Sequence, residues 1–138
     1  STIDRYAHHA DRREPVEQAA VFAEDGRVAL YDGDPGLSDP LDVIVGRAAL
    51  ADTFAGLIAR YATTTYLNGQ STIGVLEDAR ATAETYCVAF HVLHEAGERI
   101  LLTMAIRYLD VLVKARDEWL IADRTLVIDW TDRRPSAP

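Results

Sequence analysis

Asp11 is a carboxylate in a position where it could hold a catalytic imidazole. It follows apolar residues at helical spacing and directly precedes Arg12-Arg13-Glu14-Pro15, so it falls at the end of a predicted helix. A carboxylate beside a histidine fixes the tautomer of the imidazole and stabilises its charged form. Asp11 is therefore a candidate catalytic residue, either as a base or as the group that orients a histidine. The alternative is a surface helix cap or an ion-pair partner of Arg12 or Arg13.

His91 is the histidine best placed to act as an acid or a base. It lies near the end of the predicted strand Thr82–Val92, where Thr85, Cys87 and Ala89 share its face at a spacing of two. This face carries the smaller residues of the strand, which suits the wall of a cavity. An unperturbed imidazole titrates near neutral pH, so His91 could move protons in such a cavity. A partly solvated histidine at the strand end is the alternative.

Three tyrosines could bind a substrate oxygen. Tyr31 ends a short predicted strand, Tyr108 lies on a long one, and Tyr6 lies on the first predicted helix. A phenol can donate a hydrogen bond to an oxygen that gains negative charge in a transition state. We favour Tyr31 and Tyr108 for this role, although each tyrosine taken singly is more simply explained as a core residue with its hydroxyl at the rim.

The other histidines give no sign of a metal site. His94 lies close to a turn and is expected to be exposed, and His8 and His9 are adjacent, so they point to different faces of a helix. No pair of histidines at ligand spacing is present, so we expect no metal and no cofactor. The motifs that cradle phosphates or dinucleotides, and the nucleophile elbow of serine hydrolases, are missing as well.

Composition limits the classes of partner. The 138 residues include 14 Lys+Arg and 22 Asp+Glu, which gives a net charge of −8 and disfavours nucleic acid and anionic membranes. The single cysteine excludes an internal disulfide. No apolar run approaches the roughly 20 residues that cross a bilayer, and no signal peptide is visible. We expect one globular domain, located in the cytoplasm.

Helical patterns occupy the first half of the chain and strand patterns the second. Helices are predicted around residues 3–10, from Pro15 to about Glu24, and after Gly46. Long strands are predicted at Thr82–Val92, Ile100–Lys114 and Trp119–Trp130, joined by turns at 95–98 and 116–118. Short strands are predicted at 27–31 and 43–45, separated by a loop. We read Arg107, Asp110, Arg124 and Asp129 mainly as ion pairs on the outer face or at an interface. This order of elements favours an α+β fold in which a curved, mostly antiparallel sheet wraps around three helices.

Several short motifs resemble those of the SnoaL-like family in the nuclear transport factor 2-like superfamily. They occur in the family's order, over nearly the whole chain: Tyr6-Ala7-His8-His9-Ala10-Asp11, Phe22-Ala23-Glu24-Asp25-Gly26, Val45-Gly46-Arg47-Ala48-Ala49-Leu50, and Glu118-Trp119-Leu120-Ile121. The group includes scytalone dehydratase, hexachlorocyclohexane dehydrochlorinase and bile acid 7α-dehydratase. The resemblance implies a cone-shaped α+β barrel spanning residues 1–130, followed by a tail over 131–138.

The resemblance also implies roles for particular residues. In the dehydratases the Asp at the end of the first helix orients a His that follows a Thr-rich stretch, and here Thr65 falls at the place of that His, with Tyr66 beside it. His91 resembles a second pocket His on a later strand, so it could replace the missing one. The resemblance places Tyr31 and Tyr108 at polar positions of the pocket. The remaining predicted binding residues are Tyr6, Thr65, Tyr66, Cys87, Met104, Ile106, Phe54 and Leu57.

The expected function is that of a lyase or isomerase that needs no cofactor and acts on a small hydrophobic, cyclic molecule. Proton abstraction next to a carbonyl or a leaving group would start the reaction. A non-catalytic binding or assembly subunit, resembling the small subunits of aromatic-ring dioxygenases, is the alternative from another class, and a polyketide-cyclase-like enzyme is a third. Members of the superfamily commonly self-associate through the outer face of the sheet, which implies a dimer or a trimer.

Overall fold

Three helices form the first layer of the computed structural model, which describes residues 1–137. They are α1 (Thr2–Asp11), α2 (Pro15–Ala19) and α3 (Arg47–Arg60). Ser1 caps α1, because its hydroxyl accepts a hydrogen bond from the backbone N–H of Asp4. Pro15 begins α2 as predicted, but the helix ends at Ala19 rather than near Glu24. The chain after it is drawn into the sheet, where the backbone N–H of Ile121 donates to the carbonyl of Val21.

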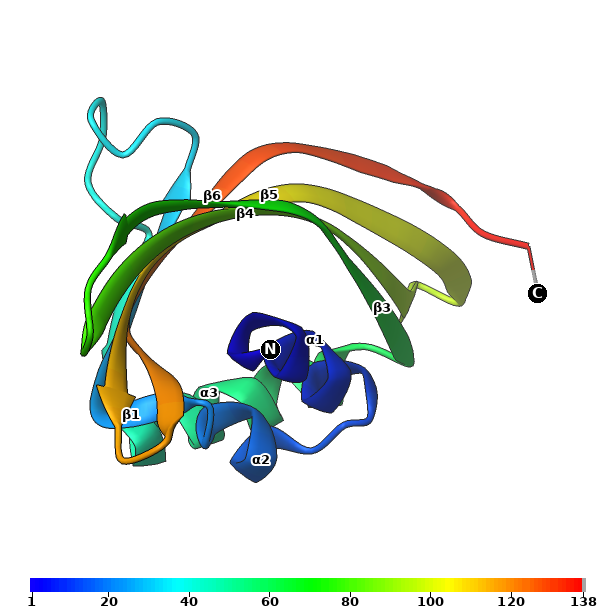
Figure 1. Cartoon of the computed structure of the whole chain (residues 1–138). Helices are drawn as coiled ribbons and strands as arrows, with labels where there is room; N and C mark the ends of the chain where they lie inside the picture. Colours follow the sequence, from blue (N-terminus) through cyan, green and yellow to red (C-terminus); the bar gives the residue numbers. More distant parts are fainter. Residues whose placement is uncertain (138) are drawn as a thin grey trace.

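Six strands form one strongly curved sheet over these helices (Figure 1). They are β1 (Phe22–Asp32), β2 (Asp42–Val45), β3 (Thr63–Leu76), β4 (Arg80–Glu95), β5 (Glu98–Ala115) and β6 (Glu118–Pro135). Their order across the sheet is β2-β1-β6-β5-β4-β3. Every neighbouring pair is antiparallel except β1 and β6, which are parallel. The predicted α+β cone with three helices inside a curved, mostly antiparallel sheet is confirmed.

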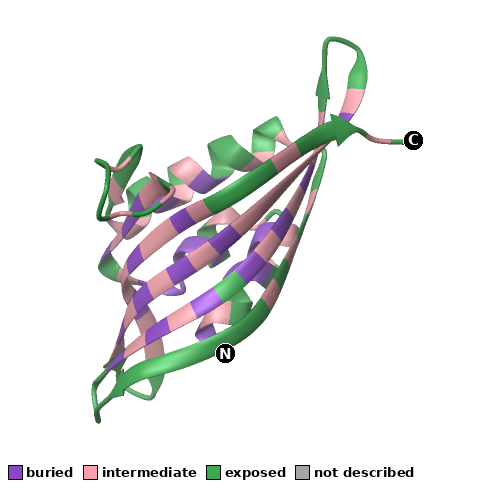
Figure 2. Ribbon diagram, turned by 90° about the horizontal axis from the view of Figure 1, so that it is seen from above, coloured by how far each residue is buried: buried purple, intermediate pink, exposed green. Residues whose placement is uncertain are grey.

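The core lies on the concave side of the sheet, which we call the hollow. Alternate residues of β4 and β5 point into it, and they pack against Tyr6 of α1 and Leu50 and Phe54 of α3. The rings of Phe22, Phe54 and Tyr108 surround Tyr6 at centroid distances of 5.7–6.1 Å. Seen from above, the central strands alternate between buried and less buried residues, whereas β3 at the edge is mostly exposed (Figure 2). The small inner residues of β4 leave room for the aromatic rings of Tyr6 and Phe54.

A bulge near the start of β1 bends the strand around the helices. The pairing of β1 with β6 shifts between Phe22 and Arg27, and Gly26 lies inside this shift. A Cβ atom on Gly26 would come within 2.8 Å of the Ala23 carbonyl oxygen and 3.2 Å of that of Ile121. Only glycine lets the two backbones approach this closely.

The sequence reading missed one element and ended another too early. The Thr-rich stretch after α3 is a full edge strand, β3, which the sequence reading did not identify because its apolar residues show no clear alternation. The expected tail over 131–138 is mostly strand, because β6 continues to Pro135, opposite Ile100 of β5. Within the described residues, none of the helices is both long and apolar enough to cross a membrane.

Candidate active site

Asp11, at the last residue of α1, is bonded to the start of β3. One carboxylate oxygen accepts a hydrogen bond from the Thr64 hydroxyl at 3.0 Å, and both oxygens lie within 3.2 Å of the Tyr66 backbone nitrogen. Among the described residues, no hydrogen bond or ion pair joins Asp11 to His91. The predicted direct Asp–His pair is therefore replaced by a contact through Tyr66.

His91 is buried in the hollow and has a fixed orientation. Its Nδ1 lies 3.2 Å from the carbonyl oxygen of Leu102, and its Nε2 lies 3.3 Å from the Tyr66 hydroxyl. A carbonyl can only accept, so Nδ1 carries the proton and Nε2 offers a lone pair to the phenol. Burial lowers the pKa of His91 below its ordinary value of 6.5, which keeps the ring neutral at neutral pH. His91 thus has the tautomer and the charge of a general base.

Tyr66 has the properties of a proton donor. Burial, reinforced by the nearby phenols, thiol and Asp11 carboxylate, raises the pKa of Tyr66 well above its ordinary value of 10. The phenol therefore stays protonated and can donate either to His91 or to an oxygen placed next to it. It lies at the wall of a cavity of about 30 Å³, between α1, α3 and the start of β3, together with Tyr6, Ala10, Gln18, Phe54, Leu57, Ile58, Tyr61 and Thr64.

The structure places Tyr66, and not its neighbour Thr65, on the inner face of β3. Thr65 is exposed and pairs with Phe90 on the outer face of the sheet, so the structure does not bring this predicted binding residue to the hollow. Thr64 and Tyr66, on either side of it, point into the hollow. Because successive residues of a strand face opposite sides, a shift of one residue exchanges an outer side chain for an inner one. Tyr66 is the residue that faces both Asp11 and His91.

The tyrosines predicted to bind substrate oxygen are separated. Tyr31 pairs with Val127 on the outer face of the sheet, whereas its neighbour Leu30 pairs with the inner residue Leu126, so the structure does not bring Tyr31 to the hollow. Tyr108 and Tyr6 do lie in the hollow, but they are packed against each other with ring centroids 5.8 Å apart. Burial raises the pKa of Tyr108 well above its ordinary value, so this phenol stays protonated.

The other predicted binding residues divide between the cavity wall and the packed core. Phe54, Leu57 and Tyr6 line the cavity, and Leu57 lies at its rim, where it is exposed. Cys87 and Ile106 are buried in the core cluster, and Met104 packs against that cluster. The residues that line the cavity come from the three helices, the segment after α3 and the start of β3, and none of them lies on β4 or β5.

Arg124 and Asp110 form a buried ion pair that the sequence reading assigned to the outer face. Arg124 donates to both Asp110 oxygens at 2.8 and 2.9 Å, and neither side chain is exposed to solvent. The guanidinium lies 3.8 Å from the Tyr108 ring centroid and 4.5 Å from that of Tyr6. The sequence did hold a sign of this burial: Tyr108 and Asp110 are two residues apart on one strand, which puts both side chains on the same face of the sheet.

The prediction of ion pairs on the outer face does fit the other two of these four residues, Arg107 and Asp129. Arg107 donates to both oxygens of Asp129 at 2.8 and 2.9 Å, on the opposite side of the sheet, where both side chains are partly exposed. The two pairs have the same geometry and differ in burial.

A larger cleft lies at the other end of α1. It has a volume of about 480 Å³ and is bordered by the ion pair between Arg5 and Glu118, whose atoms are 2.9 Å apart. Its lining is mainly apolar and includes Ile3, Ile73, Leu76, Leu112 and Trp119. None of Asp11, Tyr66 and His91 lines this cleft, whereas Tyr66, which contacts both of the others, lines the smaller cavity. We therefore place the candidate active site at the smaller cavity.

Known proteins share this fold. One of them is a protein from Novosphingobium aromaticivorans that has been assigned as a scytalone dehydratase. Its structure superposes on this one with a TM-score of 0.80 and shares 25% sequence identity; the alignment covers 95% of this chain and 81% of the other. The hexachlorocyclohexane dehydrochlorinase LinA type 2 superposes with a TM-score of 0.77 at 13% sequence identity, and the alignment covers 99% of this chain and 84% of the other. The β subunit assigned to an aromatic-ring-hydroxylating dioxygenase of N. aromaticivorans superposes with a TM-score of 0.76 at 20% sequence identity, and the alignment covers 94% of this chain and 85% of the other.

Comparisons of sequence point in the same direction as the fold. No curated protein matches the sequence. The model of the SnoaL-like domain matches residues 1–125, which is nearly the entire chain. The chain therefore belongs to the SnoaL-like domain family.

Proposed function

We propose that this protein is a lyase or isomerase that acts on a small hydrophobic, cyclic substrate through proton transfers by its own side chains. The observation that carries this proposal is the Tyr66–His91 pair, a protonated phenol facing a neutral imidazole beside a cavity. Similarity to proteins assigned as a dehydratase and a dehydrochlorinase supports the same class of reaction.

In the proposed reaction, His91 removes a proton from a carbon next to a carbonyl group. The C–H electron pair moves into a new carbon–carbon double bond, and the carbonyl oxygen becomes an enolate oxygen that accepts a hydrogen bond from Tyr66. Expulsion of a leaving group from the next carbon then gives elimination, whereas return of the proton to a different carbon gives isomerisation. A cyclisation would start from the same enolate.

Asp11 acts on this reaction as a positioning residue. It holds the backbone of Tyr66, and its negative charge raises the pKa of His91, against the lowering by burial. The same charge stabilises the imidazolium that forms when His91 takes up the substrate proton. Asp11 therefore supports both members of the pair without touching either of their reacting atoms.

Substrate entry requires the end of α3 to move. The cavity of about 30 Å³ is smaller than the roughly 150 Å³ that hold a benzene ring. Tyr61 covers His91 at a ring distance of 4.6 Å, and Arg13 donates to the carbonyl oxygens of Ile58 and Tyr61. Release of this contact would let Tyr61 and Leu57 swing outward and admit a ring.

Exchange of carbon-bound hydrogen in D₂O tests the proton transfer without knowledge of the substrate. Cyclic ketones, such as tetralones and cyclohexenones, are incubated with the protein and followed by NMR. We expect exchange next to the carbonyl, a loss of about 100-fold or more in His91→Gln, a loss of similar size in Tyr66→Phe, and no change in His94→Gln. Absence of exchange in the wild type, or equal exchange in His91→Gln, would contradict the proposal.

The small cavity also favours a second candidate, a non-catalytic binding or assembly subunit. A filled interior needs no substrate, and the β subunit assigned to a dioxygenase has the same fold. If this alternative is correct, the ketones should show no exchange of carbon-bound hydrogen in the presence of the protein, whether or not they bind.

We also propose that the protein forms a dimer or a trimer through the outer face of the sheet. Leu67, Tyr86 and Trp130 are exposed on this face, and apolar residues of β4 and β5 lie between them. An apolar face of this kind is typical of a surface that a second protein chain covers.

A further inference from the structure

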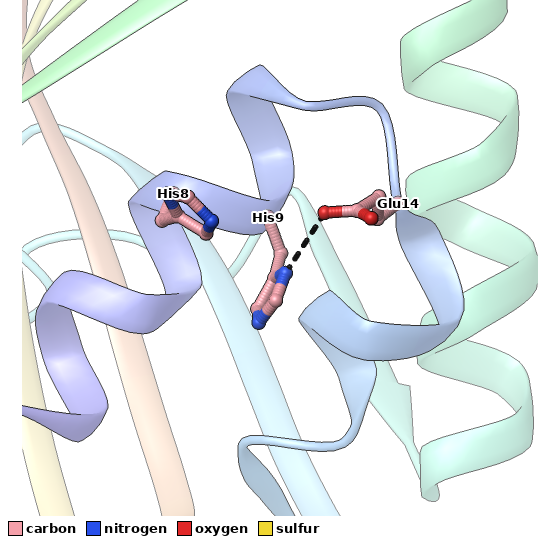
Figure 3. Close-up of side chains that lie close together, drawn as sticks. All are labelled: His8, His9 and Glu14. Atoms are coloured by element: carbon pink, nitrogen blue, oxygen red, sulfur yellow. Dashed lines mark hydrogen bonds and ion pairs between the residues drawn. The ribbon is translucent and has the colours of Figure 1, made fainter.

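His8, His9 and Glu14 come together at the end of α1 (Figure 3). Each offers one ligand atom, and these atoms lie within 4.8 Å of one another. Nδ1 of His9 is 3.1 Å from a carboxylate oxygen of Glu14, and the two imidazole rings are 5.1 Å apart. The sequence reading expected no metal site, because no pair of histidines at ligand spacing lies on one face.

The turn after α1 supplies the third member of the group. Arg13 adopts a left-handed conformation with φ of 61°, and the backbone N–H of Glu14 donates to the His9 carbonyl at 2.9 Å. The chain therefore reverses, and the Glu14 side chain folds back over the last turn of the helix (Figure 3). This contact spans five residues and crosses a helix end, so a search for ligands at regular helical spacing misses it.

The donor set is typical of a transition-metal site. Two imidazole nitrogens and one carboxylate oxygen are the ligands of many zinc sites, whereas Ca²⁺ and Mg²⁺ prefer oxygen alone. The negative end of the helix dipole and the net charge of −8 both favour a cation at this place.

Two features must adjust when a metal binds. Arg12 lies 3.4 Å from the Glu14 carboxylate, but it is largely exposed and can turn into solvent. The ligand atoms must approach to the separation set by zinc bonds of about 2.0–2.2 Å. His8 is exposed and His9 and Glu14 are only partly buried, so their side chains can rotate without disturbing the core.

We propose that His8, His9 and Glu14 form a binding site for a divalent transition metal such as Zn²⁺, with water completing the coordination. The metal would tie the end of α1 to the turn that leads into α2. Asp11 is the last residue of α1, directly before this turn, so a bound ion would stiffen the backbone that presents its carboxylate to Tyr66. This proposal is independent of the proposed reaction, since binding can be measured without a substrate.

Calorimetric titration of the tag-free full chain with Zn²⁺ tests the site. We expect one ion per chain, and at least about tenfold weaker binding in each of His8→Gln, His9→Gln and Glu14→Gln. His94→Gln is the matched control, because this exposed histidine lies on β4 outside the group. Zinc should also shift the imidazole NMR signals of His8 and His9 and leave those of His94 in place.

Two outcomes would overturn the proposal. One is the absence of binding at millimolar Zn²⁺ by a wild-type protein whose circular dichroism shows that it is folded. The other is binding that the three variants do not weaken, which would place the ion elsewhere. Thermal unfolding in EDTA checks that each variant folds as the wild type does, so that a loss of binding reports on the ligands.

Discussion

Replacement of Asp110 by Asn should destabilise the fold by about 3 kcal/mol, because it leaves the buried Arg124 guanidinium without a counter-charge. Both side chains are fully buried, and the two hydrogen bonds between them are 2.8 and 2.9 Å long. Loss of one partner of such a pair costs about 3–5 kcal/mol. Asn still offers one oxygen to the guanidinium, so we expect the lower end of this range.

Asp129→Asn is the matched control for this experiment. The Arg107–Asp129 pair has the same two-bond geometry, but its side chains are 26% and 34% exposed. Water can solvate the arginine that remains, so the loss should be below about 1 kcal/mol. Geometry and residue types are the same in both pairs, but Arg107 also lies 3.6 Å from a carboxylate oxygen of Glu84. A small loss in Asp129→Asn therefore reflects both the exposure of Arg107 and this second carboxylate.

Urea unfolding followed by tryptophan fluorescence measures both variants. Asp110→Asn should lower the midpoint at an unchanged denaturant slope and lower the Tm by about 10 °C, given roughly 2–8 °C per kcal/mol for domains of about this size. The double variant Asp110→Leu/Arg124→Met should recover most of the stability, since it removes both charges. Equal, small losses in Asp110→Asn and Asp129→Asn would refute the reasoning, because they would show that water reaches Arg124.

Three further measurements test other parts of the structure. The free energy of unfolding should fall as the pH drops below 6.5, because the unfolded chain then protonates His91 more readily than the folded one. In urea titrations at several pH values, His91→Gln should lose this part of the pH dependence of stability, and His94→Gln should keep it. Gly26→Ala should lower the free energy of unfolding by about 1–3 kcal/mol, because its Cβ would lie 2.8 Å from a backbone oxygen. Gly56→Ala, on the open side of α3, should instead raise it by roughly 0.5–1 kcal/mol in the same assay. Trp130→Glu should convert the expected dimer or trimer into a monomer in sedimentation velocity, and an unchanged sedimentation coefficient would argue against the outer face as the interface.

The sequence determined most of the local structure. Glu14-Pro15 and Gly46 marked the starts of α2 and α3, and the β-rich runs in the second half marked β4, β5 and β6. These features depend on the conformational preferences of neighbouring residues and on the regular spacing of apolar ones. The edge strand β3 was missed, because it is largely exposed and needs no regular apolar face.

Only the tertiary structure decided which side of each strand faces the helices. Thr65 and Tyr66 are neighbours with similar prospects in the sequence, and the pairing of β3 with β4 put Tyr66 opposite Ala89, on the inner face. Asp110 is buried because Arg124 of β6 reaches it across the sheet, a contact between residues 14 positions apart. A local pattern shows that side chains alternate, but the register with the next strand and the helix packed below decide which set is inside. The candidate site consists of such contacts, from Asp11 to Tyr66 and from Tyr66 to His91, so it exists only in the folded chain.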